Sequence, residues 1–268
     1  MKRMRKVEAE ALARATSPWM RHHFGKGEIG GFWDPADDDF STAPKEGEKA
    51  FAFSFCGDIP RCIKWAKQAP RVEGMFFNDC HSGEATGMAA YGGLKDLADL
   101  RYLTIRDSRP LDGETLRMIA GLPRLEGLAL ALQRIDSGKS LRELAACRSL
   151  RALMIGVEDL SDEEGPWVED LQFLSGLPLL ENLDVSDCHR VDLSRFVLPP
   201  ALKVFTVPNY TATEVKRRFR EKCAVIKGGL MHSPCRNRFG NQPERAVPKN
   251  RPKRSVPKSD SPGQATLF

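Results

Sequence analysis

Six segments of the chain share one apolar pattern, and this repetition limits the possible fold more than any other feature. Each segment has apolar residues at its first, fourth and sixth positions, and the six begin at Val72, Leu100, Leu125, Leu150, Leu180 and Leu202. Successive starts are separated by 28, 25, 25, 30 and 22 residues. Because side chains alternate along a strand, the fourth and sixth positions share one face of a short strand. The spacing predicts a stack of similar units.

The segments between these strands predict helices or helical turns. GETLRMIAGLP, KSLRELAACRS and WVEDLQFLSGLP each carry apolar residues at three-residue steps, namely Leu116, Ile119 and Leu122, then Leu141, Leu144 and Cys147, then Leu171, Leu174 and Leu177. That spacing gives one apolar helical face. A single strand–helix unit cannot bury both of its faces, so we expect stacked units to share one continuous core.

The pattern resembles the leucine-rich repeat, LxxLxLxxN/C, from about Val72 to Gly229. The resemblance implies an α/β solenoid, in which a short curved parallel sheet carries helices or helical turns on its convex side. Cys80 and Cys188 occupy the ninth position, where the family pattern takes Asn or Cys. The other four segments depart from it, with Ser108, Gln133, Glu158 and Tyr210, so uneven turns are expected.

Three regions are predicted. Residues 49–229 form the repeat array with its caps: a half-buried strand in KAFAFSFCG, a helix in PRCIKWAKQAP, and a final helix and strand in TATEVKRRFREKCAVIKGG. Residues 1–48 hold a charged amphipathic helix and a partly ordered stretch, which Trp19, Phe32 and Trp33 anchor to the body. Residues 230–268 are rich in Pro and charge and are expected to be disordered.

The resemblance also predicts where a protein partner binds. In the family, the strands line the concave face and the residues between the core positions point outward from it. The partner-binding residues predicted on this face are Phe76, Tyr102, Thr104, Arg106, Met154 and Asp184. An apolar floor with an aromatic edge suits a peptide or a packed segment. The alternatives are that the chain's own N-terminal segment covers this face, or that the face is merely low in charge.

Composition and motifs weigh against several other classes of protein. GxSxG, GxxxxGK[ST] and HExxH are all missing, so no enzyme and no cofactor are expected. The seven cysteines include no CxxC pair, so we expect buried thiols and no metal site. No apolar run approaches the ~20 residues that cross a bilayer, which predicts a cytoplasmic protein without membrane contact.

Charge is unevenly distributed. The net charge is +5, but residues 229–268 alone carry eight basic and two acidic residues, a net +6, which leaves −1 for the remainder. A neutral body is a poor candidate for a dedicated nucleic-acid-binding domain. The segment EDLSDEEGPWVED is strongly acidic. It either contacts a basic partner, folds back on the basic tail, or is a solvated loop.

The chain's last residues, QATLF, resemble the bacterial sliding-clamp-binding motif: Gln, two variable residues, Leu and Phe. The resemblance implies that Leu267 and Phe268 fill an apolar pocket on the DNA polymerase clamp and that Gln264 hydrogen-bonds at its rim. The basic tail would then add weak contacts to DNA phosphates. The prediction is a non-enzymatic adaptor. The alternative is a repeat module without clamp binding, nuclear in a eukaryote, where KNRPKRSVPK is a localisation-type cluster.

Overall fold

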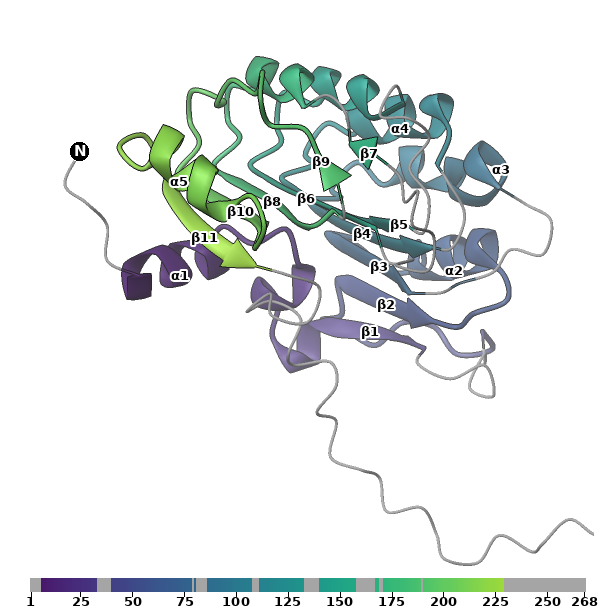
Figure 1. Ribbon diagram of the computed structural model, residues 1–268. Coiled ribbons are helices and arrows are strands. Elements are labelled where there is room, and N and C mark those ends of the chain that lie inside the picture. The colour runs from purple at the N-terminus through teal and green to yellow at the C-terminus, as the bar shows by residue number, and fades with distance from the viewer. Residues whose placement is uncertain are drawn as a thin grey trace, which may run out of the picture.

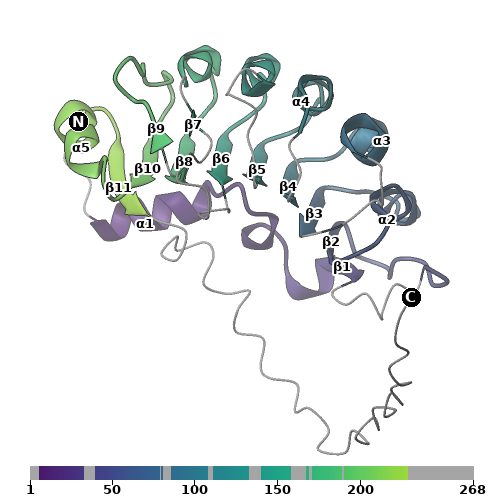
Figure 2. The ribbon, with the colours of Figure 1, turned by 45° about the vertical axis from the view of Figure 1, so that its right-hand side comes forward.

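The protein is an α/β structure built on one open, all-parallel sheet of nine strands (Figure 1). The computed structural model describes residues 6–32, 40–78, 80, 86–107, 111–132, 140–157, 167–168, 171–188 and 190–228. The sheet order follows the chain, as β1 (Ile29–Phe32), β2 (Ala50–Ser54), β3 (Gly74–Asn78), β4 (Tyr102–Asp107), β5 (Gly127–Leu132), β6 (Ala152–Val157), β8 (Asn182–Asp187), β10 (Val204–Pro208) and β11 (Ala224–Gly228). Figure 2 shows these strands side by side along an arc.

Helices and helical turns lie on one side of this arc, which we term the outer face of the sheet (Figure 2). They are α2 (Ile59–Ala66), α3 (Gly87–Tyr91), η4 (Gly92–Asp96), α4 (Gly113–Ala120), η5 (Ser140–Ala146), η6 (Gln172–Gly176) and α5 (Ala212–Phe219). Asp58 and Asp112 start α2 and α4, because each carboxylate accepts a hydrogen bond from a backbone N–H three residues later. A separate two-stranded pair joins β7 (Trp167–Val168) to β9 (Arg190–Val191).

The main core lies between the sheet and these outer helices. The first-position leucines Leu100, Leu125, Leu150 and Leu180 are fully buried there, together with the fourth- and sixth-position residues of every repeat segment. Cys80 and Cys188 pack at the ends of their strands, where each thiol donates to a carbonyl of the preceding strand, Phe53 O at 3.4 Å and Ile155 O at 3.2 Å. The six cysteines among the described residues are all buried and form no disulfide.

The strands predicted from the repeat are all present in the parallel sheet, but three details differ from expectation. The strand around Phe51 is buried on both faces rather than half-buried, since Ala50, Ala52 and Ser54 are also covered. Phe55 leaves the strand in a left-handed conformation, with φ of 59°, and its ring is half exposed. Trp167–Val168 is a short strand instead of the start of a helix, so η6 begins only at Gln172.

The N-terminal part of the chain adds one predicted helix and one strand that was not predicted. The amphipathic helix predicted near the N-terminus is α1 (Lys6–Ala15). The Gly-rich stretch after it contributes a strand that was not predicted, β1, which adds to the edge of the sheet beside β2. Trp33 and the tail predicted to be disordered lie outside the described residues. Within the described residues, no helix is long and apolar enough to cross a bilayer.

Candidate functional site: the covered inner face

The N-terminal segment from Lys6 to Phe24, which we term the strap, crosses the inner face of the sheet opposite the outer helices (Figure 2). Its helix α1 contacts β10 and β11, and its short helix η1 (Met20–His22) contacts β3 and β4. The Asn182 side-chain amide donates to two strap carbonyls, Ala13 O and Thr16 O, both at 3.1 Å. The strap therefore runs from one end of the sheet almost to the other.

A second hydrophobic cluster holds the strap in place. Trp19 and Met20 are 4% and 2% exposed and pack against inner-face residues of five strands, namely Ala50, Ala52, Phe76, Tyr102, Ala129 and Met154. The rings of Trp19 and Phe76 lie 6.4 Å apart in a tilted arrangement. Aromatic pairs at this separation add stabilisation beyond the area that they bury.

Aromatic stacking continues at the end of the strap. The His23 ring stacks on Tyr102 at 4.0 Å, while Phe24 approaches the same tyrosine edge-on at 5.8 Å. A His23 ring nitrogen lies 2.8 Å from Ser17 O. Burial lowers the pKa of His23 and raises the pKa of Tyr102, because the charged form of each ring loses hydration. Both rings are therefore held in their neutral forms at neutral pH.

Two glycines on the sheet let the strap approach closely. A Cβ atom at Gly74 would lie 3.0 Å from the Phe24 ring and 3.2 Å from Met20 Sδ. A Cβ atom at Gly127 would lie 2.6 Å from the Tyr102 ring and 3.1 Å from Pro18. Both glycines occupy the third position of their repeat segments, so the small residues of the inner face are explained by the strap that packs on them.

The residues predicted to bind a partner all lie on this inner face, and most of them are buried. Phe76, Tyr102 and Met154 contact the strap cluster. Thr104 and Asp184 are 0% and 7% exposed. The predicted residue that is not buried, Arg106, donates to Asn78 Oδ1 at 2.9 Å. The present occupant of this face is thus the chain itself. The clamp-motif residues Gln264, Leu267 and Phe268 lie outside the described residues.

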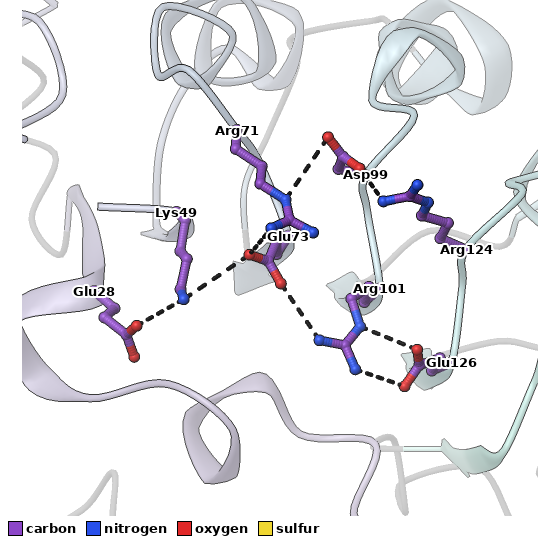
Figure 3. A network of polar contacts seen from close by, with 8 residues as sticks. All are labelled: Glu28, Lys49, Arg71, Glu73, Asp99, Arg101, Arg124 and Glu126. Carbon is purple, nitrogen blue, oxygen red and sulfur yellow. Dashed lines mark hydrogen bonds and ion pairs between the residues drawn. The ribbon is translucent and has the colours of Figure 1, made fainter. Parts of the chain in front are cut away.

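A row of alternating charges borders the inner face where the strands begin (Figure 3). We term it the charge row; its members, one immediately before each of the first eight strands of the sheet, are Glu28, Lys49, Glu73, Arg101, Glu126, Arg151, Glu181 and Lys203. Lys49 lies 2.7 Å from Glu28, Glu73 lies 3.4 Å from Arg101, and Lys203 lies 2.7 Å from Glu181. The buried Glu73 also lies 3.3 Å from Arg71 and 3.9 Å from Lys49.

Arg101 is the best-connected member of the charge row. Its guanidinium donates two hydrogen bonds of 3.0 Å to the two carboxylate oxygens of Glu126 (Figure 3). This bidentate contact raises the pKa of Arg101, against the smaller opposing effect of burial. Because each pair joins neighbouring strands, the charge row favours one alignment of those strands.

Sequence reasoning missed the charge row, although the signal is present in the sequence. The second position of the six repeat segments reads Glu73, Arg101, Glu126, Arg151, Glu181 and Lys203, which alternates in sign without exception. In parallel strands of matched register, equal positions become neighbours, so this alternation predicts cross-strand ion pairs.

A small cavity of about 70 Å³ remains between the strap and the charge row. Thr16, Ser17 and His23 line it from the strap, and Glu126, Arg151 and Glu181 line it from the sheet. Arg151 pairs with Glu181 at 3.7 Å. A space of this size holds a few water molecules. Among the described residues, no group of three or more His, Cys, Asp or Glu side chains is arranged to hold a metal ion.

Comparison with known proteins found no match from which a function could be inferred. No protein-family model matches the chain, and no curated protein is significantly similar to it in sequence. The features from which a function is argued are therefore the repeat pattern, the covered inner face and the sequence of the tail.

Proposed function

We propose that this chain is a non-enzymatic adaptor of the leucine-rich repeat type, tethered to the bacterial sliding clamp by Gln264, Leu267 and Phe268. The observation that carries the scaffold part is the peptide-like strap on the inner face. A largely helical segment with two buried apolar anchors, Trp19 and Met20, already fills the surface on which such scaffolds hold their partners. The tether part is supported by the sequence QATLF.

The repeat assignment is supported by agreement between pattern and packing. Residues at the first, fourth and sixth positions of the repeat segments enter the main core, while third- and fifth-position residues face the strap. The strands β3, β4 and β5 are each followed along the chain by a helix or helical turn and then by the neighbouring strand of the sheet, an order that supports a solenoid of stacked units.

A second protein reaches Phe76, Tyr102 and Met154 in this proposal only by replacing the strap. The test uses a fluorescent peptide of residues 6–28 added in trans. It should bind with micromolar affinity to the Trp19→Ala chain, whose own strap is weakened, and not to the unmodified chain, whose face is occupied. Equal weak binding to both chains would remove the inner face as a peptide site.

The clamp tether is tested on the intact chain with a purified bacterial sliding clamp. Biolayer interferometry should show micromolar binding, because few atoms of a five-residue motif are buried and the tail must be ordered. The variant Leu267→Ala/Phe268→Ala should lose this binding, whereas Thr266→Ala, at a variable position of the motif, should keep it. Binding that survives the double substitution would refute the tether. The chain would then be the alternative, a repeat interaction module without clamp binding.

A further inference from the structure

Positive charge is concentrated at one end of the sheet. Residues 212–228, which form α5 and β11, include six basic and two acidic residues, a net +4, and residues 229–268 that follow carry a net +6. Since the whole chain has a net charge of +5, residues 1–211 carry −5. The body is therefore not uniformly neutral: its last folded unit shares the positive charge of the tail.

Five side chains of this unit form a surface that we term the basic end: Lys216, Arg217, Arg220, Lys222 and Lys227. All five are exposed. Within the described part of the chain, none of the five forms an ion pair, whereas Lys49, Arg101 and Lys203 of the charge row are all paired. The basic end thus gathers five cations at one end of the sheet that no carboxylate of the described residues pairs.

The structure fixes the direction in which these cations point. Val215 and Phe219 are buried against the core, so the opposite side of α5 faces outward, and Lys216 and Arg220 lie one turn apart on it. Lys227 is in register with Val207, a residue of the main core, and so lies on the same face of the sheet as α5. Figure 1 shows α5 and β11 side by side at this end.

Arg218 has a different role, which keeps α5 in place. Its guanidinium donates to three backbone carbonyls of the preceding loop, Leu193 O at 2.6 Å, Ser194 O at 2.8 Å and Phe196 O at 2.9 Å. Charge-assisted bonds of this kind are stronger than neutral ones. The basic end is consequently presented on a helix anchored to the body.

We propose that the basic end binds the phosphate backbone of nucleic acid without reading base sequence. Protein interfaces concentrate aromatic and aliphatic side chains at their centre, and the exposed positions of α5 carry none. Binding to a phosphate backbone requires only closely spaced cations.

The experiment measures binding of the full chain to a fluorescent duplex DNA of arbitrary sequence, by anisotropy at several salt concentrations and with no clamp present. The chain should bind with a Kd of about 10⁻⁴–10⁻⁶ M near physiological salt. The variant Lys216→Gln/Arg217→Gln/Arg220→Gln keeps the tail. It should reduce the slope of log K against log salt by about 2.7 and the affinity by about 500-fold near 0.1 M salt.

The matched control removes the same charge elsewhere. Lys45, Lys64 and Lys95 are exposed and form no ion pair in the described part of the chain, so Lys45→Gln/Lys64→Gln/Lys95→Gln should bind DNA nearly as the unmodified chain does. Equal losses in both variants would show that only net charge matters and would overturn the proposal. Unchanged binding in the α5 variant would also overturn the proposal.

Vesicles with about one-third anionic lipid test a membrane surface as the other possible ligand. Tighter binding to them than to DNA, lost in the α5 variant alone, would assign the basic end to a membrane surface instead.

Discussion

Replacing Trp19 by alanine is predicted to open the strap while leaving the sheet folded. Truncating a buried Trp to Ala costs about 3–5 kcal/mol, because transfer energy is lost and a cavity remains. Trp19 is 4% exposed and packs on Phe76 and its neighbours. We therefore expect Trp19→Ala to weaken docking of the strap by at least about 3 kcal/mol. A change of about 3 kcal/mol multiplies the ratio of open to docked strap about 150-fold.

Native-state hydrogen exchange measures this ratio directly. In the strap, the amides of Thr16, His22 and His23 donate to strap carbonyls and report its opening. Their exchange should accelerate by about 150-fold in Trp19→Ala. The amide of Leu128 in β5 should keep its rate, since the main core lies on the other face of the sheet.

The matched control is Val7→Ala, on the same strap. Val7 is 74% exposed, so its truncation should leave every strap amide unchanged. The reasoning is refuted if Trp19→Ala also leaves them unchanged, because the inner face would then be held closed by something other than the aromatic contact. Equal acceleration in the strap and in β5 would show that strap and sheet unfold as one unit, which contradicts a separable strap.

Three further predictions concern the same face. Gly127→Ala places a Cβ atom 3.1 Å from Pro18 and should accelerate exchange in the strap as Trp19→Ala does, with Gly121→Ala as a control on the outer side. Glu73→Ala removes a carboxylate shared by three cations and should lower the free energy of unfolding by about 1–2 kcal/mol, which is measured as a lower Tm. The decrease in Tm should be smaller in about 1 M salt, and an unchanged Tm at low salt would contradict this prediction. His23 has a pKa below 6.5 when docked, so the open strap binds more protons as pH falls. Docking should be strongest above about pH 6.5 and weaken below it, and His23→Gln should remove that dependence; an equal dependence in the variant would refute the assignment.

Much of the fold follows from local pattern. Leu100, Leu125, Leu150 and Leu180 lie where the repeat requires a core residue, and the period places strands beside strands without further information. Departures occur where the pattern ends. β1 in the sequence IGGF has no alternating apolar pattern, and its place in the sheet comes from pairing with β2, which is not a local property of the sequence.

The candidate site was predictable only in part. The sequence predicts Phe76, Tyr102 and Met154 as the apolar part of the inner face, and coverage by the N-terminal segment is one of three interpretations that it allows. Nothing local distinguishes these interpretations, since the contact between Trp19 and Phe76 joins residues far apart in the chain. In the sequence alone, Gly74 and Gly127 are simply small residues. The structure shows that they leave room for the strap to approach the sheet. The basic end was hidden by averaging, because acidic residues elsewhere in the body cancel its charge.

The proposed adaptor role is tested most directly by the tail on its own. A fluorescent peptide of residues 255–268 is titrated with a purified bacterial sliding clamp, beside the same peptide carrying Leu267→Ala/Phe268→Ala. Micromolar binding that disappears in the substituted peptide is the predicted result. No binding at about 100 μM would contradict the tether, since a five-residue anchor weaker than that would be of little use.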